Sequence, residues 1–196
     1  LSVVVLMGLI GLFWTPQPPA AITGGLREMP SAAHWLGTDG AGFDIASRLM
    51  AGTKLVLLVG VVSVAGAALV GIPAGVVAGM SRGWMSAIIS RGADILYGFP
   101  ALLLAILFAA ALGGSIWTAS MAIALSTVPA FVRIARAATL QVMKLAYVEA
   151  ARLSGTPVRQ IALRHVLPNI APVLGVQASV SVGIAILAEA GLSYLG

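Results

Sequence analysis

Two long stretches of this sequence carry no charged side chain, one from Leu55 to Ser81 and the other from Ile95 to Val132. Each is longer than the ~20 apolar residues that a helix needs to cross a bilayer. Only 9% of all residues are charged, whereas a soluble domain has about 25%. Helices satisfy their backbone hydrogen bonds internally, as lipid requires. The sequence therefore predicts an all-α integral membrane protein.

The apolar segments predict five helical spans. Gly113–Ser115 divides the longer run into spans near Ile95–Leu112 and Ile116–Val132, and Val166–Ala188 supplies another. Residues 1–14 are apolar but too short to span and lack a basic leading region, which disfavours a secretory signal peptide. We expect them to be a truncated first transmembrane helix, so that the five spans belong to a fragment of a six-span chain.

The basic residues are distributed unevenly. Residues 15–54 and 113–115 have no net charge, residues 81–94 are slightly basic, and residues 133–165 hold six Lys and Arg residues against the single acid Glu149. The positive-inside rule places the two basic segments in the cytoplasm and the two neutral segments outside. Topology thus accounts for the net charge of +5, and no nucleic-acid partner is needed to explain it.

The chemistry of the sequence contains no sign of an enzyme. There is no cysteine, so thiolate metal sites and disulfides are excluded. Neither Lys54 nor Lys144 stands in a GxxxxGK[ST] phosphate loop. His165 has no second ligand at metal-binding spacing. We predict no catalytic, cofactor-binding or metal-binding residue in this chain, and any ATP hydrolysis has to come from a partner.

Three glycines recur at intervals of four residues in the first long apolar run: Gly71, Gly75 and Gly79. They share one helix face, and small residues at this spacing let two membrane helices approach closely. The stripe predicts helix packing, either as a specific contact in a transport core or as ordinary bundle packing.

The basic cytoplasmic segment predicts two helices. Residues 133–154 contain good helix formers and no proline, and Gly155 suits a left-handed helix end. The dipeptide Thr156-Pro157 suits the N-cap and first position of a second helix extending to about Leu167. Pro168 is expected to kink the chain where it re-enters the membrane. One face of the second helix should gather Val158, Ile161, Ala162 and His165.

The outer segment, residues 15–54, opens with a proline-rich stretch and is expected to be a connector. Thr38 or Asp39 is expected to cap a short amphipathic helix within it. Two interpretations of Asp39 and Asp44 remain open. They either contact a cationic substrate terminus or a metal, or they cap the helix and pair with Arg48.

The cytoplasmic segment resembles the EAA signature of ABC importer permeases. Glu149-Ala150-Ala151, Gly155 and Leu167-Pro168 match that signature at full spacing. His165 replaces the usual Ile and resembles the Arg-His-x-Leu-Pro-Asn form of peptide-transporter permeases. Residues 34–48 and 94–105 are similar to the C-type permeases of dipeptide, oligopeptide and nickel importers, although Phe43 stands where that pattern has Arg.

The resemblance implies a type I ABC importer transmembrane fold over residues 55–196, with residues 133–167 as the cytoplasmic coupling segment. Its expected ATPase-coupling residues are Glu149, Ala150, Ala151, Gly155, Leu167 and Pro168. The implied partners are a second permease subunit, two cytoplasmic ATPase subunits that bind ATP and Mg²⁺, and an extracytoplasmic solute-binding protein. The implied location is the bacterial cytoplasmic membrane, with several passes through the lipid.

Three classes of function remain open at this point. The first is an ATP-driven importer of peptides, nickel chelates or other small solutes. The second is an ATPase-independent channel or secondary transporter; the absence of a charge deep in any span counts against proton coupling without excluding it. The third is an anchoring protein whose cytoplasmic loop recruits a regulator.

Overall fold

The computed structural model describes residues 2–195, and it describes the side chains of residues 5–193 except 101, 102, 105 and 109. Residues 1 and 196, which begin and end the expected domains 1–14 and 55–196, lie outside the described residues. The regular elements of the described chain are all helical. They are α1 (Ser2–Ile10), α2 (Ile45–Met80), α3 (Trp84–Tyr97), α4 (Ala101–Leu112), α5 (Ile116–Val142), α6 (Ala146–Leu153), α7 (Val158–Ile161), the π-helix η1 (Ala162–Val166) and α8 (Leu167–Leu195).

Among the described residues, three continuous helices are long and apolar enough to cross a membrane. They are α2, α5 and the continuous helical stretch Val158–Ser193, which joins α7, η1 and α8. The prediction of an all-α membrane protein is confirmed. Helices α1 and α4 are shorter than the ~20 residues that a single span requires.

The predicted boundaries of two helices are wrong. Residues 95–112 do not form one helix, because α3 ends at Tyr97 and α4 begins only at Ala101. Pro100 disfavours helical backbone at the residue before it, so the chain breaks across Gly98-Phe99. As a result α3 occupies most of the segment 81–94 that was expected to be a loop.

The chain divides into two compact units, Leu1–Leu58 and Val59–Gly196. In the first unit, the connector after α1 has no regular helix until Ile45. The predicted separate amphipathic helix is therefore wrong, since its residues form the first turns of α2. Two isolated antiparallel bridges, Ile22 with Phe43 and Thr38 with Asp44, hold the connector in its folded-back shape.

In the second unit, the glycine stripe of α2 lies against α5. A Cβ added to Gly71 would lie 2.6 Å from the Cβ of Phe131, and one added to Gly79 would lie 2.7 Å from the Cβ of Thr139. One added to Gly75 would lie 2.5 Å from a carbonyl oxygen of α5. Real Cβ contacts are not this short, so any side chain at these positions would push the two helices apart.

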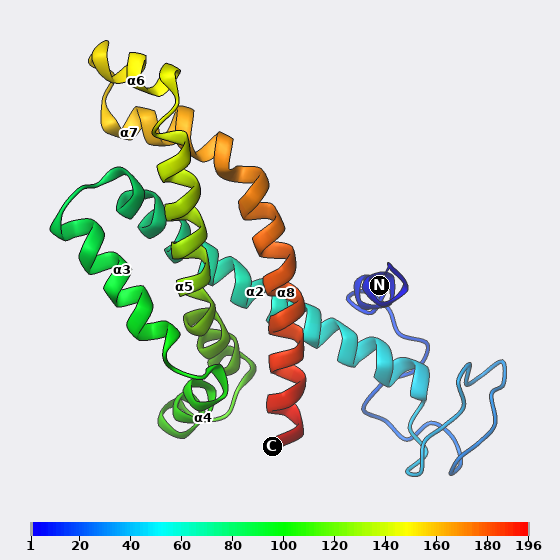
Figure 1. Cartoon of the computed structure of the whole chain (residues 1–196). Helices are drawn as coiled ribbons and strands as arrows, with labels where there is room; N and C mark the ends of the chain where they lie inside the picture. Colours follow the sequence, from blue (N-terminus) through cyan, green and yellow to red (C-terminus); the bar gives the residue numbers. More distant parts are fainter. Residues whose placement is uncertain (1, 196) are drawn as a thin grey trace. The chain divides into compact units, whose positions relative to one another are not determined.

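Two apolar clusters fill the second unit. One lies between α2, α3, α5 and α8 and is centred on Phe131, which is fully buried. The other joins the end of α5 to α6, α7, η1 and the start of α8. Figure 1 shows α5 and α8 side by side, with α6 and α7 together at one end of this pair. The second cluster thus fixes the cytoplasmic segment to the two helices that flank it in sequence.

Candidate functional site

The segment expected to be cytoplasmic, residues 133–167, begins within α5, which ends at Val142. The prediction of one helix over residues 133–154 is wrong, because Lys144 and Leu145 form a turn and α6 starts anew at Ala146. Leu145 has extended backbone and its carbonyl accepts hydrogen bonds from the N–H groups of Val148 and Glu149. Because of this turn, α6 is a separate helix and not a continuation of α5. Glu149 therefore lies on a short helix of its own.

Helix α6 ends in a Schellman motif centred on Gly155. The N–H of Thr156 donates to the carbonyl of Ala151 at 3.1 Å, and the N–H of Gly155 donates to the carbonyl of Arg152 at 3.0 Å. Gly155 has a φ of 75°, a left-handed conformation that glycine adopts without a Cβ penalty. The predicted helix end at Gly155 is confirmed. Capping by Thr156 is wrong, because Pro157 occupies the N-cap and no side chain caps α7.

The chain then enters the α8 helix without a break. Pro168 lacks an N–H, and its ring would clash with the carbonyl of Arg164 in a regular α-helix. The preceding residues widen into the π-helix η1 instead, which accommodates the proline. The amide of Asn169 donates to the carbonyl of His165 at 2.6 Å. The helix therefore continues through Pro168, and the π-turn precedes the proline at which the sequence predicts a kink.

The underside of this segment is apolar and closely packed. Val148 on α6, Ile161 on α7 and Val166 on η1 are each no more than 1% exposed. They belong to the cluster that includes Ala135 and Val142 of α5. The rings of Tyr147 and His165 also lie 5.8 Å apart in a tilted arrangement, linking α6 to η1. His165 therefore packs against a neighbouring aromatic ring.

The predicted coupling residues lie mostly on the opposite, exposed side. Glu149, Ala150, Gly155 and Pro168 are exposed, whereas Ala151 and Leu167 are half-buried. We call the exposed residues of 149–164 the outer face. Apolar side chains are prominent on it: Leu153 is 85% exposed and Val158 is 69% exposed. Val158 was predicted to share one helix face with Ile161, and the two side chains differ in burial because Val158 lies at the first turn of α7.

A shallow depression of about 280 Å³ lies on the outer face. Its walls are Pro157, Arg159, Gln160, Leu163 and Arg164. Two guanidinium groups beside exposed apolar side chains suit a partner surface that offers carboxylates and apolar contact. No group of three or more His, Cys, Asp or Glu side chains in the described chain is placed to hold a metal ion.

The connector carries a second polar constellation, centred on Asp44. This buried carboxylate accepts hydrogen bonds from the backbone N–H and the hydroxyl of Ser47, at 2.8 and 2.7 Å, and caps α2. Nδ1 of His34 lies 3.0 Å from its other oxygen. Burial raises the pKa of Asp44, but the hydrogen bonds from Ser47 and His34 outweigh burial and lower it overall.

Asp39 organises the neighbouring turn. It accepts hydrogen bonds from the N–H groups of Ala41 and Phe43, which lower its pKa, and Arg48 lowers it further. Arg48 lies 2.6 Å from the other oxygen of Asp39 and its guanidinium stacks 4.8 Å from the centre of the Phe43 ring. The geometry favours the capping and ion-pairing interpretation of both acids, although the cap is Asp44 and not Thr38 or Asp39.

The structure also pairs two residues that sequence reasoning left apart. Asp94 of α3 lies 2.7 Å from Arg133 of α5, and the Arg133 guanidinium stacks 4.2 Å from the centre of the Tyr97 ring. The sequence placed Asp94 at the edge of a span and Arg133 at the start of the basic segment. The opposite charges of the two side chains were the only signal of this pair in the sequence. The pair could not be predicted from them, because it depends on the contact between α3 and α5.

Residues 71–196 match the family described as "Binding-protein-dependent transport system inner membrane component". The chain is 40% identical to the glutathione transport system permease protein GsiD of Pectobacterium atrosepticum, over 87% of this chain and 57% of that protein. It is 39% identical to the probable D,D-dipeptide transport system permease protein DdpC of Escherichia coli, over 100% of this chain and 67% of that protein. It is 42% identical to the dipeptide transport system permease protein DppC of Alkalihalophilus pseudofirmus, over 85% of this chain and 55% of that protein.

This chain thus spans between 55% and 67% of the length of these relatives. The matched family region includes the glycine stripe and the whole cytoplasmic segment. The printed names describe all three relatives as permease proteins of transport systems. The chain belongs to the family of binding-protein-dependent transport system inner membrane components.

Proposed function

We propose that this chain is a membrane-spanning permease subunit of an ATP-driven importer of peptides or related small solutes. It forms half of a translocation pathway together with a second permease subunit. Two cytoplasmic ATPase subunits carry the ATP and Mg²⁺, and a solute-binding protein delivers the substrate from outside. The printed names of the relatives, which specify glutathione, dipeptides and D,D-dipeptides, support a peptide substrate.

One observation carries the proposal: the outer face of residues 149–164 is exposed while its underside is fixed. Val148, Ile161 and Val166 join the segment to α5 and α8 through apolar contacts. A partner that moves Glu149 or Ala150 would therefore displace the ends of two membrane helices. This is the mechanical requirement of alternating access, in which ATP binding draws the two coupling segments of the transporter together and hydrolysis releases them.

Small side chains support a close approach of the partner. Ala150 is exposed on α6, and the glycine at position 155 leaves open space, with no atom within 4 Å of an added Cβ. Exposed Leu153 and Val158 provide apolar surface, and the arginines of the depression provide positive charge. Docking on a cleft with acidic and apolar walls would bury the small side chains, the apolar surface and the arginines together.

The test is peptide uptake into proteoliposomes by the complete transporter. Uptake should require ATP, and Ala150→Trp should lower it at least tenfold, because the large ring prevents docking. Ala111→Trp, a matched change at an exposed alanine of α4, should leave uptake within about twofold. Uptake that persists without ATP and is unchanged by Ala150→Trp would support an ATPase-independent channel and contradict the proposal.

A further inference from the structure

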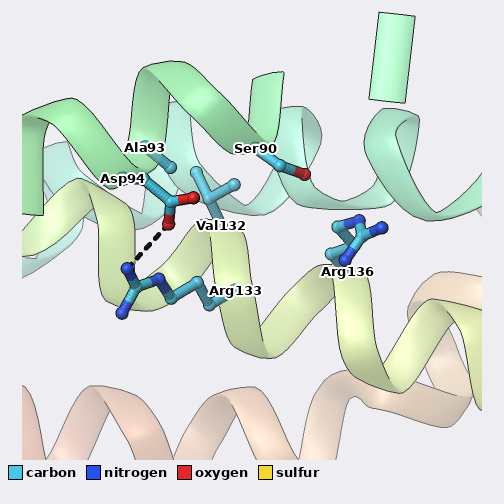
Figure 2. Close-up of a pocket in the computed structure, with 6 residues that line it drawn as sticks. All are labelled: Ser90, Ala93, Asp94, Val132, Arg133 and Arg136. Carbon is cyan, nitrogen blue, oxygen red and sulfur yellow. Dashed lines mark hydrogen bonds and ion pairs between the residues drawn. The ribbon is translucent and has the colours of Figure 1, made fainter. Parts of the chain in front are cut away.

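A pocket of about 210 Å³ lies between α3 and α5, apart from the coupling residues (Figure 2). Ser90 and Asp94 are one turn apart on α3, and Val132 and Arg136 are one turn apart on α5. The lining therefore combines polar side chains of both helices with the apolar side chains of Ala93 and Val132. The pocket is lined by Ser90, Ala93, Asp94, Val132, Arg133 and Arg136.

The charges of the pocket do not cancel. Asp94 and Arg133 neutralise each other at 2.7 Å, at one end of the view in Figure 2. Arg136 lies at the other end, and in the described chain no carboxylate lies within 4.0 Å of it. One positive charge is therefore left over, on Arg136. A partly buried guanidinium without a counter-charge is unfavourable, so this site is suited to a bound anion.

Two hydrogen-bonding atoms of the same pocket also lack partners. Nε of Arg136 and Oγ of Ser90 are both buried, and neither is hydrogen-bonded in the described chain. Nε of Arg136 can only donate, and the Ser90 hydroxyl can donate as well. Buried polar groups in folded proteins nearly always have partners. What the pocket lacks is a negatively charged acceptor that can receive several hydrogen bonds.

The size of the pocket restricts the ligand. Pockets for drug-sized molecules have volumes of about 300–1,000 Å³, so 210 Å³ is small for a peptide. It exceeds the ~30 Å³ that one water molecule occupies in the liquid. An anionic group of a few heavy atoms fits between these limits. Tetrahedral phosphate accepts the paired donors of an arginine and has further oxygens for a hydroxyl.

The position of the pocket along the chain favours a phosphate source at the membrane. Arg133 and Arg136 begin the basic segment that the positive-inside rule places on the cytoplasmic side, where the leaflet is rich in acidic lipids. We infer that this pocket binds a phosphate group, held by Arg136 and Ser90 and supplied by an acidic lipid headgroup or by free phosphate. The Asp94–Arg133 pair closes its other end.

The experiment uses the full-length protein, purified in detergent with the subunits that accompany it. Native mass spectrometry measures retention of phosphatidylglycerol, with phosphatidylcholine as the zwitterionic comparison. A parallel arm titrates inorganic phosphate against the lipid. Arg136→Gln should lower phosphatidylglycerol retention about tenfold, as expected for the loss of charged hydrogen bonds, and Ser90→Ala should lower it less. Arg91→Gln, at an exposed arginine of α3 outside the pocket, should leave retention within twofold.

The lipid-retention arm and the phosphate-titration arm together identify the source of the phosphate group. Loss of lipid without competition by inorganic phosphate identifies a headgroup, and competition at millimolar phosphate identifies a site for the free anion; both support the inference. Equal losses in Arg136→Gln and Arg91→Gln would overturn it, because general surface charge would then explain the binding. A structure of the assembled transporter with a partner carboxylate within 4 Å of Arg136 would also overturn it. Thermal unfolding of Arg136→Gln and of Ser90→Ala shows whether each variant is folded, and Ser90→Ala tests the pocket with its charge unchanged.

Discussion

The part of the connector before α2, residues 15–44, and the part of the coupling segment after α5, residues 143–166, are both short links in a hydrophobic chain, but different forces hold them. In the connector, the buried carboxylate of Asp44 gathers hydrogen bonds from His34 and Ser47. In the coupling segment, Ile161 and Val166 are buried among apolar side chains. A polar network defines the shape of the first, and an apolar underside anchors the second.

This difference matches what each segment presents to its surroundings. Hydrogen-bond networks are directional and depend on protonation, so the connector has one defined shape that acid can weaken. Apolar contacts leave the charged and small residues of the coupling segment free, and Glu149 and Ala150 are exposed for a partner. The comparison predicts that changes beneath the coupling segment act on its anchoring, whereas changes on its outer face act on coupling alone.

The largest effect is expected from Ile161→Ala, which removes a side chain that is 1% exposed. Truncating a buried isoleucine costs about 2–5 kcal/mol. Thermal unfolding in detergent, together with trypsin cleavage after Arg159, should show a loosened coupling segment. Val158→Ala, at a neighbouring side chain that is 69% exposed, should change stability by less than about 0.5 kcal/mol. Equal effects of the two substitutions would disprove the assignment of the anchored side.

A smaller effect is expected from Asp44→Asn in the connector. Hydrogen bonds to a charged group contribute about 1.5–3 kcal/mol, so proteolysis of the connector should increase. The pKa of Asp44 is lowered in the folded protein, so its stabilising contribution is complete above an unfolded pKa of about 3.9 and is lost as the pH falls through the folded value.

Protease protection of the parent connector should therefore decline below about pH 4, and the Asp44→Asn variant should lack this step. Asp39→Asn, at a more exposed carboxylate, should weaken protection less. The Ile161→Ala variant should keep the pH profile of the parent, because apolar anchoring does not depend on this carboxylate. If the connector of the unsubstituted protein shows no loss of protease protection in acid, the claim that a polar network holds the connector is contradicted.

The smallest effect on stability, but a specific one on coupling, is expected from Gly155→Ala. Gly155 and Gly83 both have a φ of 75° and open space around them. An alanine costs about 1–2 kcal/mol in the left-handed conformation of Gly155, and it costs more at Gly83, whose ψ of −139° lies near a region that is essentially restricted to glycine. Only Gly155→Ala should lower the amount of peptide taken up per ATP hydrolysed, measured as the uptake rate relative to the ATPase rate. If Gly83→Ala uncouples transport equally, backbone strain alone explains the result.

The sequence was sufficient where the signal is local. The uncharged runs predicted the long helices α2 and α5, and Gly155 predicted the end of α6. The break at Gly98-Phe99 also had a local signal in Pro100, but the length of the uncharged run concealed it. By contrast, the turn at Lys144-Leu145 contains neither glycine nor proline, so helix propensity continues through it.

What the sequence could not show depends on tertiary packing. The Asp94–Arg133 pair joins residues 39 positions apart and exists only because α3 packs on α5. The π-helix before Pro168 is one of several ways in which a helix accommodates a proline, and the sequence alone did not distinguish among them. Periodicity grouped Val158 with Ile161 on one face, but it could not show that Ile161 is buried while Val158 is exposed.

The central claim is that the outer face of residues 149–164 docks on an ATPase subunit. The most direct test is crosslinking from Ala150→Cys in the assembled transporter, since the chain contains no native cysteine. Gly114→Cys, in the exposed turn assigned to the outside, is the control. The account predicts a crosslink to an ATPase subunit from position 150, with a yield that changes when ATP binds, and none from position 114. Absence of any ATPase crosslink from position 150, in a transporter that still takes up peptide, would contradict it.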